Sequence, residues 1–173
     1  MSVVMPIFNI IYSLGLFMGI GGSVLYSSEK GRRENGCYNE FFSTALLGTA
    51  ALAAIAWTGI VFFGEPLLRL FGAEQTLLPL TKAYLFPIKI VIPVFVFNQM
   101  LAAFLRNDNA PGLATAAVLG GGIFNVFGDY FFVFAMDMGI LGAGLATAAG
   151  ACITLLIMLT HFFSKRCTLK FVS

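Results

Sequence analysis

The sequence predicts an all-α membrane protein with five membrane-spanning helices. Of its 173 residues, 59% are hydrophobic and 10% are charged, whereas a soluble domain has about 45–50% apolar and about 25% charged residues. So few charged side chains cannot cover the surface of a soluble fold of this size. Crossing a hydrocarbon core of about 30 Å takes about 20 mostly apolar residues, because a helix rises about 1.5 Å per residue. Five segments meet this requirement: 3–27, 43–63, 80–105, 112–135 and 140–163.

Small residues indicate how the first and last spans pack. Gly15 and Gly19 form a G-x-x-x-G step in the first span, and Gly142, Ala146 and Gly150 lie along one face of the last span. Such stripes let helix backbones approach closely in a bilayer. We expect close helix packing at both places and not phosphate-binding loops, because no strand precedes these glycines.

The third span is the one in which the sequence predicts a bend. Pro87 and Pro93 lie inside it. Proline has no N–H group, and its ring clashes with the carbonyl group four residues earlier in a helix. We therefore expect a kink or break here, and bent helices often line cavities in transporters.

The basic residues predict the orientation of the chain. Seven of the ten Lys and Arg residues fall in the first loop, the third loop and the tail, which lie on one side of the membrane: Lys30, Arg32, Arg33, Arg106, Lys165, Arg166 and Lys170. The positive-inside rule makes this side cytoplasmic. The N-terminus is then outside the cell membrane and the C-terminus is in the cytoplasm. Because no secretory signal precedes this outside start, we expect the chain to be a piece of a longer protein whose first helix is missing.

Residue counts argue against several classes of function. The net charge is +2 and the basic residues are scattered, so the chain has no nucleic-acid footprint. Cys37, Cys152 and Cys167 have no C-x-x-C spacing, and His161 is the single histidine. We therefore expect free thiols, no zinc site and no cofactor, with His161 at the membrane interface. An intramembrane enzyme is not favoured, since no acidic pair occupies adjacent turns of a span.

Asp129 and Lys89 are the charged residues that fall well inside a span. A charge at the bilayer centre costs at least about 2.5–3.5 kcal/mol, so such residues suggest a function. Asn125 lies one turn before Asp129 on the same helix face. Asp129 is about 9 Å from the outer end of its span, and Thr147 is about 10.5 Å from the outer start of the next. Antiparallel packing of these two spans is expected to bring the three side chains together.

The predicted cluster of Asn125, Asp129 and Thr147 has the chemistry of a cation site. Carboxylate, amide carbonyl and hydroxyl oxygens suit Na⁺ or another hard cation. The carboxyl group could bind a proton instead, because desolvation favours its neutral form. The alternative is a polar cluster that only locks two helices together.

Lys89 has two interpretations. It lies about 13 Å from the outer end of its span by the helical rise, so it can face the bundle interior as a counter-charge or cavity residue. Alternatively, its ammonium group extends towards the outer headgroups, helped by the distortion at Pro87. The sequence does not choose between them.

Several stretches resemble the multidrug and toxic compound extrusion (MATE) family. Residues 16–25, which precede a basic loop, are similar to the second helix of that family, and residues 104–111 to the loop after its fourth helix. The most specific features are the spacing Asn125-x-x-x-Asp129 and the run 138–147, which resemble its fifth and sixth helices. The resemblance covers nearly the whole chain.

This resemblance implies an antiporter that exports drugs or organic cations by alternating access, coupled to Na⁺ or H⁺. The family has two lobes of six helices, so the chain resembles helices two to six of the N-terminal lobe, a five-span piece of it. By position, Asn125, Asp129 and Thr147 match the family's N-lobe cation site, and Asn98 resembles a polar position of its fourth helix that would face the cavity. The implied partners are small organic cations, the lipid bilayer, and the missing first helix and second lobe.

Two alternatives remain open from the sequence. One is a lipid-linked sugar flippase of similar fold, although such proteins usually have a more cationic cavity than Lys89 alone would provide. The other is a truncated remnant that does not transport.

Overall fold

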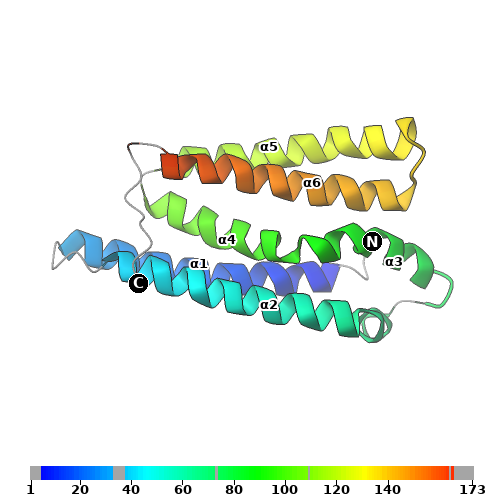
Figure 1. Ribbon diagram of the computed structural model, residues 1–173, viewed down its shortest axis with the longest axis horizontal. Helices are drawn as coiled ribbons and strands as arrows, with labels where there is room; N and C mark the ends of the chain where they lie inside the picture. The colour runs from blue at the N-terminus through cyan, green and yellow to red at the C-terminus, as the bar shows by residue number, and fades with distance from the viewer. Residues whose placement is uncertain (1–4, 33–37, 73, 109, 164, 166–173) are drawn as a thin grey trace.

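The computed structural model of the chain describes residues 5–32, 38–72, 74–108, 110–163 and 165. Every regular element in these residues is a helix, which confirms the predicted all-α class. Figure 1 shows the helices in chain order. They are α1 (Met5–Arg32), α2 (Tyr38–Leu70), α3 (Leu78–Ile90), α4 (Ile92–Asn107), α5 (Pro111–Asp129), the π-helical turn η1 (Tyr130–Ala135), α6 (Ile140–Leu159) and the 3₁₀ turn η2 (Thr160–Phe163).

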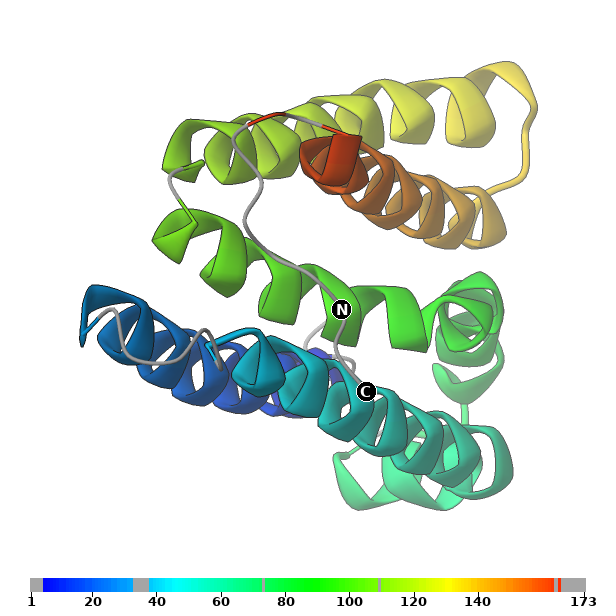
Figure 2. The same ribbon diagram turned by 60° about the vertical axis from the view of Figure 1, so that its left-hand side comes forward.

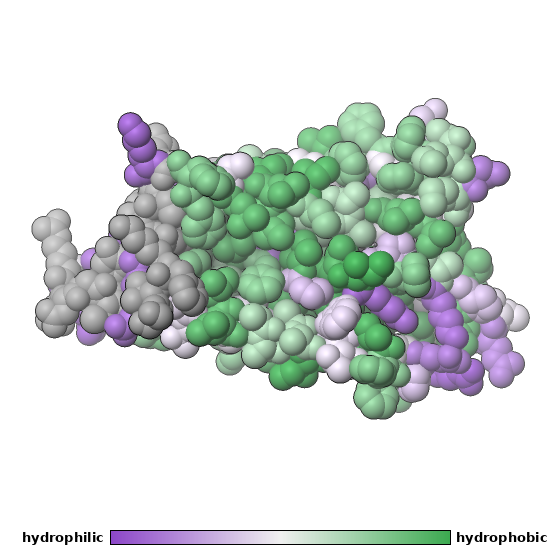
Figure 3. Space-filling view, in the orientation of Figure 1, coloured by the Kyte–Doolittle hydropathy of each residue, from purple (hydrophilic) through white to green (hydrophobic). Residues whose placement is uncertain are grey.

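The helices have the length and composition of membrane spans. Within the described ranges, four are long and apolar enough to cross a bilayer, or five if the bent pair α3 and α4 is one span. Figure 3 shows apolar side chains over the middle of the molecule and polar side chains towards its two ends. An apolar belt between polar ends is the surface expected of a protein embedded in lipid.

The helices form two antiparallel pairs with α4 between them. Figures 1 and 2 show α1 beside α2 on one side of α4, and α5 beside α6 on the other. At the left of Figure 1, α1, α4 and α6 end, and Asp108 is the residue that directly follows α4. At the right, the chain turns back from α5 into α6, through η1 and the loop that contains Asp137. We call these the Asp108 end and the Asp137 end.

Glycines let the helix backbones touch in both halves of the molecule. A Cβ atom on Gly19 of α1 would lie 2.8 Å from the Cα of Met100 in α4. One on Gly150 of α6 would lie 2.8 Å from the carbonyl oxygen of Gly121 in α5. These distances leave no room for a side chain, so the small-residue stripes serve helix packing.

The break between α3 and α4 falls at Val91, where the backbone leaves the helical conformation (φ −106°, ψ 14°). The two helices meet there at an angle of 58°. Pro93 follows in the first turn of α4, where its missing N–H group costs nothing, whereas a continuous helix would place its ring against the carbonyl group of residue 89. Pro87 stays inside α3, so Pro93 accounts for the break.

A second kink lies in α2, at the end of the predicted span 43–63. Phe63 has non-helical angles (φ −114°, ψ 17°), yet the helix resumes and continues to Leu70. Pro66 explains this, because a proline interrupts the preceding turn and is tolerated in the first turn of the segment that follows. The predicted span ends at residue 63, whereas the structure shows helix as far as Leu70.

Arg33, Cys37, Arg166, Cys167 and Lys170 lie outside the described residues. Cys152 is a free thiol, partly buried in α6.

Candidate cation and substrate site

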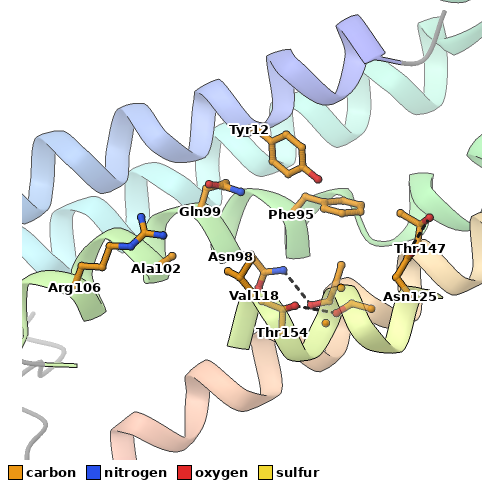
Figure 4. Close-up of a pocket in the computed structure, with 14 residues that line it drawn as sticks. Tyr12, Phe95, Asn98, Gln99, Ala102, Arg106, Val118, Asn125, Thr147 and Thr154 are labelled. Atoms are coloured by element: carbon orange, nitrogen blue, oxygen red, sulfur yellow. Dashed lines mark hydrogen bonds between the residues drawn. The ribbon is translucent and has the colours of Figure 1, made fainter. Parts of the chain in front are cut away.

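A cavity of about 320 Å³ lies among α1, α4, α5 and α6. Its size falls in the range of small-molecule sites, roughly 300–1,000 Å³. The Tyr12 and Phe95 rings form an aromatic wall, with centroids 5.9 Å apart and nearly perpendicular planes. Figure 4 shows Arg106 at one end of the lining, and Asn125 with Thr147 at the other.

Two of the predicted cation-site residues meet at this cavity. The Nδ2 atom of Asn125 donates a hydrogen bond to the Oγ1 atom of Thr147 over 3.2 Å, and both residues line the cavity. The Thr147 hydroxyl group in turn donates to the Ala143 carbonyl oxygen at 3.0 Å, and the Tyr84 hydroxyl group lies 3.5 Å from it. The Asn125 side-chain oxygen, the acceptor of that amide, is not used in these bonds.

Asp129, the third predicted residue, lies one helical turn beyond Asn125 towards the Asp137 end. Its Oδ1 atom is buried and has no hydrogen-bond partner within the described residues. Asp129 is not among the residues that line the cavity. The structure therefore leaves a buried carboxylate oxygen unsatisfied beside the Asn125–Thr147 pair, and it shows no direct bond from Asp129 to either residue.

The register of α5 against α6 explains this offset. Gly150 lies against Gly121 and Ala146 against Gly128, which puts Thr147 opposite Asn125. The prediction assumed a plain α-helix through residue 135, but Tyr130–Ala135 form a π-helical turn. A π-turn closes its hydrogen bonds over five residues. Its rise per residue is therefore smaller than the α-helical rise of about 1.5 Å from which the depth of Asp129 was calculated.

Asn98 contributes a second unsatisfied oxygen at the cavity. Its side chain is 8% exposed, and its Nδ2 atom donates to the Ala151 carbonyl oxygen at 3.0 Å, which fixes the amide between α4 and α6. Its Oδ1 atom is buried without a partner in the part of the chain that the structure describes. Asn98 lines the cavity, so this oxygen is an acceptor available to a ligand.

Lys89 lies on α3, just before the break that leads into α4. It is partly buried in the last turn of α3 and is not a lining residue. Its Nζ atom lies close to α2, where a Cβ atom on Gly64 would be 3.2 Å away. The ammonium group therefore packs against the kinked part of α2.

Sequence reasoning did not single out Tyr12, Gln99 or Thr154, which line the cavity. Arg106 also lines it, whereas the sequence indicated this residue for topology and within the motif 104–111 and not for a cavity. One signal was available: Asn98, Ala102 and Arg106 follow at intervals of four and so share a face of α4. Tyr12 carried no such signal, because its role depends on how α1 packs against α4.

Asp108 forms a charged cluster at the end of α4. It is completely buried. Lys30 and Tyr26 of α1 donate to its Oδ1 atom at 3.1 and 3.2 Å, and His161 Nε2 donates to its Oδ2 atom at 2.8 Å. His161, which the sequence analysis expects at the membrane interface, is 2% exposed, because this carboxylate holds it inside the protein.

Comparison with known proteins identifies the family. The family model described as MatE matches residues 1–131. The chain belongs to the MATE family. This confirms the resemblance carried by residues 16–25, 104–111 and the Asn125-x-x-x-Asp129 spacing, and with the apolar helices it makes the chain part of a multi-pass membrane protein.

Curated relatives of this MATE chain carry the name "Multidrug export protein MepA". The protein from Staphylococcus saprophyticus is 27% identical over 164 residues, which is 95% of this chain. One from Staphylococcus aureus is 25% identical over the same length. The chain spans 36% of the length of each of these relatives.

Solved structures of the family share the fold. An inward-facing multidrug resistance MATE transporter superposes with a TM-score of 0.91 at 23% identity, covering 99% of this chain and 39% of that one. A MATE protein in the bent conformation gives 0.90 at 23% identity, covering 98% and 38%. An outward-facing transporter gives 0.85 at 22% identity, covering 99% and 39%.

Proposed function

We propose that this MATE chain forms the cation-coupled half of a multidrug exporter, an antiporter without enzymatic activity. Na⁺ or H⁺ binds at Asp129 beside Asn125 and Thr147, and this binding changes the balance between inward-open and outward-open states. A ligand can shift two states only by its difference in affinity for them. The names of the staphylococcal relatives support the export of multiple drugs.

The observation that carries the proposal is the unpartnered Asp129 Oδ1 atom, one turn from the Asn125–Thr147 hydrogen bond. A buried polar atom without a hydrogen-bond partner costs free energy. A ligand that binds this oxygen removes that cost, so the bound state is stabilised. The three side chains offer a single negative charge and hard oxygen donors. This matches a monovalent hard cation or a proton.

The cavity supports small organic cations as the exported substrates. The Tyr12 and Phe95 rings provide π-faces that attract cations at about 6 Å or less. The Asn98 Oδ1 and Gln99 side chain add polar groups to fix a ligand. Arg106 at the far end of the lining would repel the cationic part of such a molecule, so that part is expected towards Asn125.

For orientation, we infer that the Asp108 end faces the cytoplasm. Among the described residues, Lys30, Arg32 and Arg106 lie at this end. At the Asp137 end, the basic residues Arg69 and Lys82 are both paired with Glu65. This charge distribution follows the positive-inside rule.

The test is transport in everted membrane vesicles from a host without its own multidrug exporters, with fluorescent ethidium as the probe. Both this chain and the full open reading frame that contains it are expressed. We expect a Na⁺ pulse or an acid pulse to drive ethidium movement, and the active pulse identifies the coupling ion. Asp129→Asn is expected to reduce this rate at least about tenfold, because it removes the site's charge.

Asp137→Asn is the matched control. It makes the same chemical change at an exposed residue of the loop after η1. Asp137 has φ 53°, which asparagine tolerates as well as aspartate. We expect unchanged transport from Asp137→Asn, and unchanged transport from Asp129→Asn would refute the proposal. If neither this chain nor the full open reading frame moves ethidium, the result would favour a remnant that does not transport.

A further inference from the structure

The cluster around Asp108 joins the helices that wall the cavity at one end. α1 contributes Lys30 and Tyr26, and η2, which continues α6, contributes His161. Asp108 itself caps the end of α4, and α5 begins three residues later at Pro111. Three of the four walls of the cavity, α1, α4 and α6, therefore meet at this one carboxylate, and the fourth wall begins close to it in the chain.

The cluster is built as a buried charged contact and not as a surface ion pair. The Asp108 and His161 side chains are 0% and 2% exposed, and Lys30 is 27% exposed. The Lys30 Nζ atom also lies 5.4 Å from the centre of the Tyr26 ring. The Phe104 ring covers the site from α4, with centroids 5.9 Å from Tyr26 and 5.1 Å from Phe42. Buried pairs of this kind are strongly coupled, because loss of one partner leaves a charge unpaired in an apolar surrounding.

The ion pairs of the Asp137 end are of a different kind. Glu65 pairs with Arg69 at 3.0 Å and with Lys82 at 2.7 Å, and all three side chains are at least 43% exposed. Exposed pairs such as these contribute little to stability. The two ends of the lobe therefore differ: removal of one partner should cost far more at the Asp108 end than at the Asp137 end.

We propose that Asp108 is a positioning residue that clamps the Asp108 ends of α1 and α6 to α4, so that the cavity opens towards this side only when the clamp is released. The proposal rests on the proposed function for its role in transport. The clamp itself can be measured without transport. Lys30 and Tyr26 hold the α1 side of the clamp, and His161 holds the α6 side.

A buried cysteine reports release of α1 from α4. Ser23 is 1% exposed and lies one turn before Tyr26 on α1. Ser23→Cys is nearly isosteric, and it is placed in the full open reading frame after Cys37, Cys152 and Cys167 are changed to serine. The rate of its alkylation by a water-soluble maleimide is measured in the detergent-purified protein. Ala53→Cys, at a residue 2% exposed in α2, reports general loosening.

We expect Asp108→Asn to speed alkylation of Ser23→Cys at least about tenfold, because the buried negative charge that faces Lys30 and His161 is lost. The rate at Ala53→Cys should stay within about twofold. Lys30→Met is the milder second variant, since Lys30 is partly exposed. It should raise the alkylation rate of Ser23→Cys less than Asp108→Asn does, and Lys30→Arg, which keeps the charge, should leave that rate unchanged. Glu65→Gln removes two exposed ion pairs at the other end and should change neither rate.

Two results would overturn the clamp. One is an unchanged alkylation rate at Ser23→Cys in both Asp108→Asn and Lys30→Met. The other is an equal rise at Ser23→Cys and Ala53→Cys, which would show that the cluster only stabilises the fold. Neither result touches the cation site, because Asp129→Asn is tested by transport in a different assay.

Discussion

The Asn125 amide donates a hydrogen bond to the Thr147 hydroxyl group across the α5–α6 contact, over 3.2 Å. This bond fixes the rotation of the amide, so that its oxygen is left for a ligand. The neighbouring Asp129 Oδ1 atom has no partner within the described residues. One hydrogen bond therefore orients part of the proposed cation site, and the remaining oxygens await the cation.

Thr147→Val should weaken the binding of the coupling ion. The substitution keeps the shape of the side chain but removes the acceptor of the Asn125 amide, which leaves a partly buried donor unpaired; a fully buried one would cost about 1–3 kcal/mol. We expect the half-saturating ion concentration for transport to rise about tenfold, which corresponds to about 1.4 kcal/mol. The measurement is the ion dependence of ethidium transport in vesicles.

Thr58→Val is the control for this experiment. Thr58 donates to the Ala54 carbonyl oxygen four residues back, as Thr147 does to Ala143. It is exposed on α2, away from the cavity lining. An equal change in ion dependence for both variants would contradict a specific role for Thr147.

Gly150→Ala should destabilise the α5–α6 pair. The new Cβ atom would lie 2.8 Å from the Gly121 carbonyl oxygen, so the helices must separate. Overpacking of this kind costs about 1–3 kcal/mol, and we expect a lower melting temperature in detergent. Gly59→Ala is the matched control, because no atom lies within 4 Å of its Cβ position. Alanine is the better helix former by up to about 1 kcal/mol, so its melting temperature should stay equal or rise.

Pro93→Ala should straighten the break at Val91. Alanine supplies the missing N–H group and removes the ring that clashes with a continuous helix. From the 58° bend and the helical rise, the distance between spin labels at Leu80 and Asn107 should increase by about 5 Å. Double electron–electron resonance measures this distance. Pro79→Ala, in the first turn of α3, should leave the distance unchanged. An unchanged distance in Pro93→Ala would mean that tertiary packing, and not proline, maintains the bend.

Lys89→Cys tests the two interpretations of this lysine. Because the Lys89 ammonium group packs against Gly64 of α2, away from the cavity lining, we expect slow alkylation by a water-soluble reagent. Lys82→Cys is the control, since its side chain is 44% exposed and pairs with Glu65; it should react quickly. Equal rates at the two positions would support a water-filled path to Lys89 and restore its role as a cavity residue.

Much of the fold follows from local properties of the sequence. The helix class follows from composition and segment length, and the family from motifs such as Asn125-x-x-x-Asp129. Pro93 marked the break because a proline acts on the turn that precedes it. The kink at Phe63 was missed because the apolar pattern appeared to end there, while Pro66 allowed the helix to resume.

The site was predictable in residue types and less so in geometry. The sequence alone determined that Asn125, Asp129 and Thr147 bring hard oxygens to neighbouring helices, because spacing within a helix is fixed by its period. Only the tertiary structure decided that Thr147 meets Asn125, with Asp129 one turn beyond. The register between α5 and α6 depends on which glycines touch and on the π-turn at Tyr130–Ala135.

Tertiary structure also decided the environment of the charged residues. Asp108 and His161 are 53 positions apart and form a buried pair at 2.8 Å, while Lys89 lies against α2. No local pattern specifies such contacts, because they depend on how whole helices pack across the lobe. The sequence by itself thus determined which helices form and which side chains they carry. Packing determined which of those side chains meet.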